Sequence, residues 1–341
     1  TEVFPLALFA VGGMLAFTSA GDLLTLFIAL EVLSLPLYVL CATARRRRAL
    51  SQEAAMKYFL LGAFSSAFFL MGVALLYGYA GSLNYVAIAT ALINVTGMDY
   101  LLVAGVVLVL VGLLFKVGAA PFHSWTPDAY QGAPTPITGF MAAGTKIAAF
   151  AAMLRFLYIV GRGVEWEITP ALWTIVIVTM LVGTVGGIVQ SDVKRMLAYS
   201  SIAQAGYMMT AMVATNAAGI KAVLFYAMVY VLANVGAFVT VSYLETERGG
   251  ADFCSVRGLA HDSLLPAGIL MVALLTMAGI PPTAGFVGKI YIFSAAIDAG
   301  YLWLAGLGFV VSMMSVYYYL LVIKEMFRDV EEGEKVAEEH L

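Results

Sequence analysis

Long apolar stretches recur along the whole chain, separated by short polar segments. A membrane helix needs about 20 predominantly apolar residues, and ten stretches approach or exceed that length. Stretches such as residues 101–115 lack the apolar–polar alternation of a barrel strand, so helices are expected. The predicted spans are residues 2–19, 22–43, 54–80, 100–120, 135–160, 169–190, 196–214, 218–244, 264–297 and 301–327.

The spans form two groups of five with a similar pattern. The fourth span of the first group ends at residues 116–121. The fourth span of the second group is interrupted at residues 279–285. Because five is odd, the second group must enter the membrane from the opposite side. The sequence thus predicts an all-α polytopic membrane protein with about ten transmembrane helices in two inverted five-helix repeats with broken fourth helices. The predicted domains are residues 1–160, residues 161–328 and an acidic cytoplasmic tail, residues 329–341.

Composition and charge support a membrane location. Of the 341 residues, 62% are hydrophobic and 11% charged, whereas soluble domains carry roughly a quarter charged residues. The net charge of −3 argues against nucleic acid as a partner. The expected partner is the lipid bilayer. Basic residues mark the cytoplasmic side, and threading ten spans puts most of them there together with both chain ends. They are Arg45–Arg48, Lys194, Arg195, Arg248, Arg257, Lys324, Arg328 and Lys335.

The sequence gives little support for a disulfide framework, a metal site or a nucleotide-binding site. Cys41 and Cys254 form no disulfide framework, and three separated histidines form no metal site. No glycine-rich phosphate loop follows a strand, so nucleotide binding is not indicated. We interpret Gly183, Gly186 and Gly187 as small residues that let two helices pack closely. The Arg45–Arg48 run is better explained as a topology determinant among headgroups than as a ligand site.

Four ionisable residues lie deep inside apolar stretches. Each charge at the bilayer centre costs about 2.5–3.5 kcal/mol, so these groups need partners, water or neutral states. Burial disfavours a charged lysine and a nearby carboxylate favours it, so a Glu–Lys pair can act as a proton switch. Our hypothesis is that a glutamate moves toward and away from one lysine and so changes the proton affinity of the next two. The residues, in that order, are Glu31, Lys116, Lys146 and Lys289.

Two further residues leave alternatives open. Lys57 lies near the start of its span, where it either contributes to function or makes a static pair with its amine near the interface. His123 follows the first helix break, where it either relays protons between half-channels or caps a helix end. Asp128 is better explained as a cap or loop anchor.

Five segments carry a family resemblance: residues 30–38, 57–64, 115–136, 192–201 and 279–289. The most specific is Phe-His-Ser-Trp-Thr-Pro-Asp-Ala-Tyr-Gln-Gly-Ala-Pro at residues 122–134. In these segments the chain resembles the antiporter-like subunits of bacterial respiratory complex I, and among them subunit N. The resemblance covers nearly the whole chain.

The resemblance implies a proton-translocating subunit of NADH:quinone oxidoreductase in the bacterial cytoplasmic (inner) membrane. Such a subunit has fourteen helices, so three N-terminal helices and the last one would lie outside this chain. It belongs to a translocase but holds no redox centre, so NADH, FMN, iron–sulfur clusters and quinone would bind to partner subunits. The implied partners are the other membrane subunits of complex I, including neighbouring antiporter-like subunits.

The family motifs assign roles residue by residue. The paired glutamate falls on Glu31, its partner lysine on Lys116, the central lysine on Lys146 and the terminal lysine on Lys289. Lys57 and His123 also match family positions.

Two other functions compete with this one. The first is a subunit of a multisubunit cation/proton antiporter without redox activity. A lysine at position 289 favours subunit N over its sister subunit M, but the matching component of those antiporters also carries a lysine there, so the distinction rests on the loop around His123. The second alternative is a structural membrane scaffold.

Overall fold

The computed structural model describes residues 2–44, 47–92 and 100–329, and within them the chain is helical without extended strands. Seven helical segments are long and apolar enough to cross a membrane, so the predicted all-helical, membrane-spanning class is confirmed. They are Leu23–Cys41, Arg48–Ala80, Tyr100–Val117, Thr135–Ile159, Gly161–Ile188, Ala217–Glu247 and Leu302–Met326. Val3–Ser19 and Leu264–Ala278 are shorter apolar helices.

The first half of the chain begins with three long helices and then breaks into shorter pieces. The elements are α1 (Val3–Ser19), α2 (Leu23–Cys41), α3 (Arg48–Ala80), α4 (Tyr85–Leu92), α5 (Tyr100–Val117), α6 (Trp125–Gly132), α7 (Thr135–Phe140), the π-helix η1 (Met141–Thr145) and α8 (Lys146–Ile159).

The second half of the chain also begins with long helices. A 3₁₀ turn, η2 (Gly161–Val164), leads into the long helices, and two short helices precede a second interrupted pair. The elements are α9 (Glu165–Ile188), α10 (Val193–Met212), α11 (Ala217–Glu247), α12 (Phe253–Val256), α13 (Leu259–Asp262), α14 (Leu264–Ala278), α15 (Ala284–Asp298) and α16 (Leu302–Met326).

Polar N-caps mark the start of corresponding helices in the two halves. The Asp22 carboxylate accepts from a backbone N–H of α2, and the Asp192 carboxylate does the same for α10. Such caps satisfy N–H groups that the helix leaves without partners. Each cap also forms an isolated β-bridge, Asp22 with Asn84 and Asp192 with Asp252. The two halves thus share a local anchor as well as an element order.

Both predicted helix breaks are present. Helix α5 ends at Val117 and is followed by Gly118 with φ of 79°, and α14 ends at Ala278 and is followed by Gly279 with φ of 77°. Glycine adopts this left-handed conformation without a Cβ penalty. Prolines, which lack an N–H donor, follow shortly after each glycine: Pro121 in the first break, and Pro281 with Pro282 in the second. The chain therefore changes from helix to loop and back to helix inside the packed bundle.

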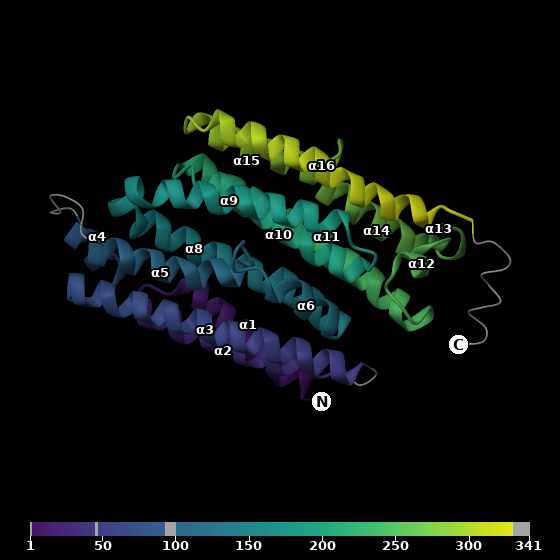
Figure 1. Ribbon diagram of the computed structural model, residues 1–341, viewed down its shortest axis with the longest axis horizontal. Coiled ribbons are helices and arrows are strands. Elements are labelled where there is room, and N and C mark those ends of the chain that lie inside the picture. Colours follow the sequence, from purple (N-terminus) through teal and green to yellow (C-terminus); the bar gives the residue numbers. More distant parts are fainter. Residues whose placement is uncertain (1, 45–46, 93–99, 330–341) are drawn as a thin grey trace.

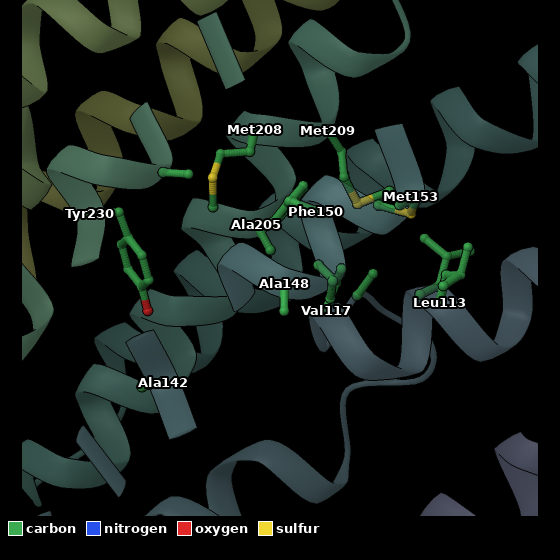
Figure 2. Packing of buried hydrophobic residues seen from close by; sticks show 14 of the residues in the cluster. Leu113, Val117, Ala142, Ala148, Phe150, Met153, Ala205, Met208, Met209 and Tyr230 are labelled. Carbon is green, nitrogen blue, oxygen red and sulfur yellow. The ribbon is translucent and has the colours of Figure 1, made fainter. Parts of the chain in front are cut away.

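The helices lie side by side along one direction, with α1–α3 at one edge, α9–α11 in the middle and α15 and α16 at the other edge (Figure 1). Helix α10 is almost entirely buried and forms the centre. Figure 2 shows buried side chains of α5, α8 and α10, among them Leu113, Met153 and Met209, filling the interior.

The glycines of α9 allow close packing, as predicted. A Cβ on Gly183 would lie 2.3 Å from the backbone nitrogen of Ala203 in α10, and one on Gly186 would lie 2.4 Å from the Tyr199 ring. A Cβ on Gly187 would lie 3.1 Å from the ring of Tyr318 in α16. In a membrane the lipid is as apolar as the helices, so helix association depends on close packing. Small residues allow the helix backbones to approach each other closely.

The structure differs from the predicted boundaries in several places. The span predicted at 54–80 begins at Arg48, and the span at 135–160 is interrupted by η1. The short helices α4, α6, α12 and α13 were not predicted, because helices of four to eight residues carry too little apolar periodicity. Arg45, Arg46 and residues 330–341 of the predicted tail lie outside the described residues.

Candidate functional site

Lys116 is buried in a polar pocket between three helices. Only 2% of the residue is exposed, and it is the penultimate residue of α5, directly before the break. Its Nζ donates to the Ser34 hydroxyl at 2.7 Å and to the Tyr58 hydroxyl at 3.2 Å. The amine also lies 5.9 Å from the Tyr38 ring centre and 5.5 Å from that of Tyr58, within the range of cation–π attraction.

Glu31 lies near this pocket but does not contact Lys116. It is half-buried near the middle of α2, and its Oε1 accepts from the Ser66 hydroxyl of α3 at 2.5 Å. Ser34, which contacts Lys116, follows Glu31 by one helical turn and lies on the same side of α2. The predicted pair is therefore close but not in direct contact, and the predicted movement of Glu31 stays a prediction.

Lys146 follows the π-helix η1 directly and is 3% exposed. Its Nζ donates to both the carbonyl and the hydroxyl of Ser201 in α10, and it lies 5.5 Å from the Tyr230 ring centre of α11. π-Helical turns inside α-helices are rare and occur often at functional sites. The central lysine thus lies where the backbone is locally widened.

Lys289 in α15 is enclosed by the second helix break. It is 5% exposed, and its Nζ donates to the Ala278 carbonyl at 2.8 Å and to the Ser312 hydroxyl at 2.7 Å. The Tyr207 ring centre lies 4.9 Å from the amine. The carbonyl at the end of α14 is one that the helix itself cannot pair, so the break supplies the acceptor.

A polar cluster on α10 and α11 lies between Lys146 and Lys289. The Gln204 amide donates to the Met277 carbonyl and to the Tyr319 hydroxyl, each at 2.9 Å, and accepts from the Tyr226 hydroxyl. Gln204 follows Ser201, the partner of Lys146, by one turn, and Met277 directly precedes the partner carbonyl of Lys289. The cluster thus lies within one helical turn of Ser201 and one residue of Ala278, the partners of the two lysines.

Several buried hydroxyl and amide groups along these helices have no hydrogen-bond partner within the described residues. Buried polar groups normally pair with protein or ordered water, so these atoms are exceptions in the described part of the bundle. They include Thr184 Oγ1, Tyr207 OH, Tyr230 OH, Tyr318 OH and both amide atoms of Asn234.

Lys57 and His123 lie in different surroundings from the three buried lysines. Lys57 has a side chain 46% exposed and pairs with Glu53 at 2.8 Å and Asp128 at 3.0 Å. Asp128 also pairs with Arg195 at 2.9 Å, so it anchors α6 to α3 and α10. His123 is half-buried in the loop before α6, and its Nδ1 is among the buried atoms for which the described part of the chain offers no partner.

The chemistry of the buried lysines follows from their partners. Each amine is held by hydroxyl or carbonyl oxygens and faces an aromatic ring, and none pairs with a carboxylate of residues 2–44, 47–92 or 100–329. Neutral dipoles stabilise an ammonium moderately, so its proton can leave and return. No cluster of three metal-ligating side chains is found among the described residues. Each of the three amines can therefore hold a proton and release it.

Comparison with known proteins shows the family to which the chain belongs. A family model described as "NADH:quinone oxidoreductase/Mrp antiporter, TM" matches residues 20–315. The chain belongs to this family. A relative from Streptomyces griseus, NADH-quinone oxidoreductase subunit N 3, is 54% identical over 339 residues, covering 96% of this chain and 61% of the relative. The chain thus spans about three fifths of the length of the curated relatives it matches.

Solved structures of the family share the fold. A chain of respiratory complex I from Thermus thermophilus with bound aureothin is 42% identical, with a TM-score of 0.84 over 97% of this chain and 72% of that one. A chain of the Mrp complex from Dietzia sp. is 27% identical, with a TM-score of 0.88 over 96% of this chain and 60% of that one.

Proposed function

We propose that the chain forms the proton-translocating core of a subunit N of NADH:quinone oxidoreductase. The observation that carries the proposal is the set of three buried amines, each within hydrogen-bond distance of neutral oxygens. Relatives more than 50% identical along most of the chain bear the name of that subunit. Protons move along these groups in response to quinone reduction elsewhere in the complex.

The proposed architecture is ten spans in two inverted five-helix repeats. Supporting it, α5 with α6 and α14 with α15 are helices interrupted after a glycine of positive φ, and each repeat has its own capped β-bridge. The repeats are residues 1–160 and 161–328, each providing one half-channel. Residues 329–341 form the acidic tail.

The proposed proton carriers are Glu31, Lys116, Lys146 and Lys289, with Glu31 as the switch. The burial of the three lysines and the half-burial of Glu31 support these roles. His123 is proposed as a further relay. Lys57 fits a static surface pair better, because its amine is exposed and paired with two carboxylates.

The proposed location is the bacterial cytoplasmic membrane, with both ends of this segment in the cytoplasm. Arg47, Arg195, Arg248, Arg257 and Arg328 support this orientation, since cations gather on the cytoplasmic side. The proposed partners are the other membrane subunits of complex I, neighbouring antiporter-like subunits and lipid. NADH, FMN, iron–sulfur clusters and quinone would belong to partner subunits.

A cation/proton antiporter subunit is the second candidate. The TM-score of 0.88 with a chain of the Mrp complex favours it slightly on shape. The sequence identity is 27% with the Mrp chain and 42% with the complex I chain. Because one fold can carry many functions, sequence identity is a better guide to function than similarity of shape. Complex I is therefore the better-supported function.

The test uses the full-length subunit in its assembled complex. Lys146→Met is expected to abolish proton pumping while the complex still assembles and co-purifies with iron–sulfur subunits. Normal pumping by this variant would support a scaffold and refute the proposal. Assembly without iron–sulfur subunits, with cation-dependent proton exchange, would identify an antiporter.

A further inference from the structure

A cavity lies at the end of the bundle where α9 and α16 begin. It has a volume of about 570 Å³, which is in the size range of small-molecule sites. The Trp173 ring centre lies 5.5 Å from the ring centres of both Tyr301 and Trp303, so aromatic contacts join α9 to the start of α16. We call it the aromatic cavity, and its lining includes Arg162, Glu165, Trp166, Glu167, Trp173 and Tyr301.

The aromatic cavity lies at the level of a membrane–water interface, on the side opposite to α12 and α13. Helix α16 begins beside the cavity and ends beside α13, where the Gly258 N–H donates to the Glu325 carbonyl (Figure 1). Tryptophan and tyrosine gather at such interfaces, and Trp166 is 89% exposed. Lipid headgroups therefore lie within reach of the cavity.

The charged groups of the aromatic cavity are held apart. The Arg162 guanidinium donates to the Thr215 carbonyl at 3.4 Å, and the Glu165 carboxylate accepts from the Thr215 hydroxyl. Within the described residues no ion pair joins Arg162 to Glu165 or to Glu167. Two carboxylates and one guanidinium give the lining one net negative charge. The cavity thus offers a cation and two anions that a ligand with both charges can pair with separately.

A phosphate linked to an ammonium group matches this arrangement. The planar guanidinium of Arg162 suits phosphate oxygens, whereas Glu165 and Glu167 suit an ammonium group. The aromatic rings of the lining also attract a cation. A headgroup with a phosphate and no cation would leave the two carboxylates facing a like charge. Among lipids, the zwitterionic aminophospholipids, such as phosphatidylethanolamine, therefore fit best.

An apolar stripe on α9 continues from the cavity toward the membrane centre. Val178, Leu181 and Val185 are 37%, 37% and 51% exposed. All three lie within roughly 40° of Glu167 around the helix axis, because an α-helix turns by about 100° per residue. A lipid whose headgroup binds beside Glu167 thus has apolar surface for its acyl chains, which a soluble ligand would not use.

We propose that the aromatic cavity binds the headgroup of a zwitterionic aminophospholipid. The phosphate pairs with Arg162, the ammonium group with Glu165 and Glu167, and the acyl chains lie along the stripe on α9. Bound lipid joins the starts of α9 and α16 to the turn at Thr215, between α10 and α11. The site is separate from the buried lysines, so it goes beyond the proposed function and would exist equally in an antiporter.

The test uses the full-length subunit in its assembled complex, in nanodiscs that contain a trace of a lipid probe with a photoreactive acyl chain. Phosphatidylethanolamine and phosphatidylglycerol probes with the same acyl chains are compared, and crosslinks to α9 are measured by mass spectrometry. The phosphatidylethanolamine probe is expected to label α9 about tenfold more, the equivalent of about 1.4 kcal/mol. Equal labelling, or more labelling by phosphatidylglycerol, overturns the proposal.

The charges are tested by combining Glu165→Gln with Glu167→Gln. Glutamine at position 165 can still accept from Thr215, but the lining changes from one net negative to one net positive charge. The preference is expected to reverse toward phosphatidylglycerol. Glu247→Gln, an exposed carboxylate at the far end of α11, is the matched control and is expected to keep the parent preference. Glu167→Gln alone serves if the double variant does not assemble, and is expected to weaken the preference. An unchanged preference in either variant overturns the ammonium site.

Glycerophosphoethanolamine distinguishes a lipid from a soluble ligand, because it has the same headgroup without acyl chains. It is expected to leave the labelling of α9 unchanged. Loss of labelling when it is added in the same amount as the probe would identify a soluble ligand and overturn the lipid site. Labelling is measured without turnover, so a failure here leaves the proposed function intact, and a failure of Lys146→Met to stop pumping leaves the lipid site intact.

Discussion

Replacing Gly279 by alanine is expected to disturb Lys289 without removing any of its partners. Gly279 has φ of 77°, a conformation that costs alanine about 1–2 kcal/mol. The added Cβ would also lie 2.8 Å from the Lys289 Cδ, so the lysine side chain must shift. Losing one of its two hydrogen bonds, to Ala278 or to Ser312, adds roughly 1.5–3 kcal/mol for a charged donor.

Gly300→Ala is the matched control. Gly300 also has a positive φ, 88°, but a Cβ there meets no atom within 4 Å, so only the backbone strain applies. The difference between the variants, roughly 1.5–3 kcal/mol, corresponds to about ten- to a hundredfold in the rate of a step that uses Lys289. Proton pumping per NADH oxidised, measured in vesicles with equal amounts of assembled complex, compares the two. Equal pumping by both variants would refute the role of Lys289.

The other predictions concern the switch, the surface and the packing. Glu31→Gln and Lys116→Met are each expected to reduce pumping in complexes that still assemble, and normal pumping by both would refute the switch. Lys57→Ala is expected to change the melting temperature and pumping little, because an exposed ion pair contributes under about 1 kcal/mol; a complete loss of pumping would show that the residue has more than a surface role. Gly183→Val is expected to abolish the yield of folded protein, since a Cβ would lie 2.3 Å from the α10 backbone. Gly12→Val, whose Cβ meets nothing within 4 Å, is the control, and an equal yield from both would contradict the packing argument.

The sequence identified the buried lysines because charge in an apolar stretch is costly and therefore rare. Lys116, Lys146 and Lys289 stand out in this way, and all three are buried as expected. The helix breaks were equally visible, because glycine and proline interrupt helices for local reasons.

The partners of those lysines were not predictable from one sequence. Ser201, Tyr207 and Tyr230 occur in apolar helices at little cost, so nothing in their local context marks them. Which of them face a lysine depends on how α10 and α11 are rotated and how deeply they pack. Lys57 shows the same limit, because its partner Asp128 lies 71 residues away.

The neutral partners of the three amines give Glu31 particular weight. Ser34 lies one turn after Glu31 and accepts from Lys116, which puts the carboxylate and the amine roughly 8 Å apart. At that distance two unit charges interact by about 2 kcal/mol with an effective dielectric constant of about 20, and by about 4 kcal/mol at about 4 Å. Moving a proton against about 200 mV requires about 4.6 kcal/mol. A shift of the Glu31 carboxylate from Ser66 toward Ser34 would therefore change the free energy of the proton on Lys116 by about 2 kcal/mol, nearly half of that work. At this step, coupling between Glu31 and Lys116 needs only the movement of one side chain on α2.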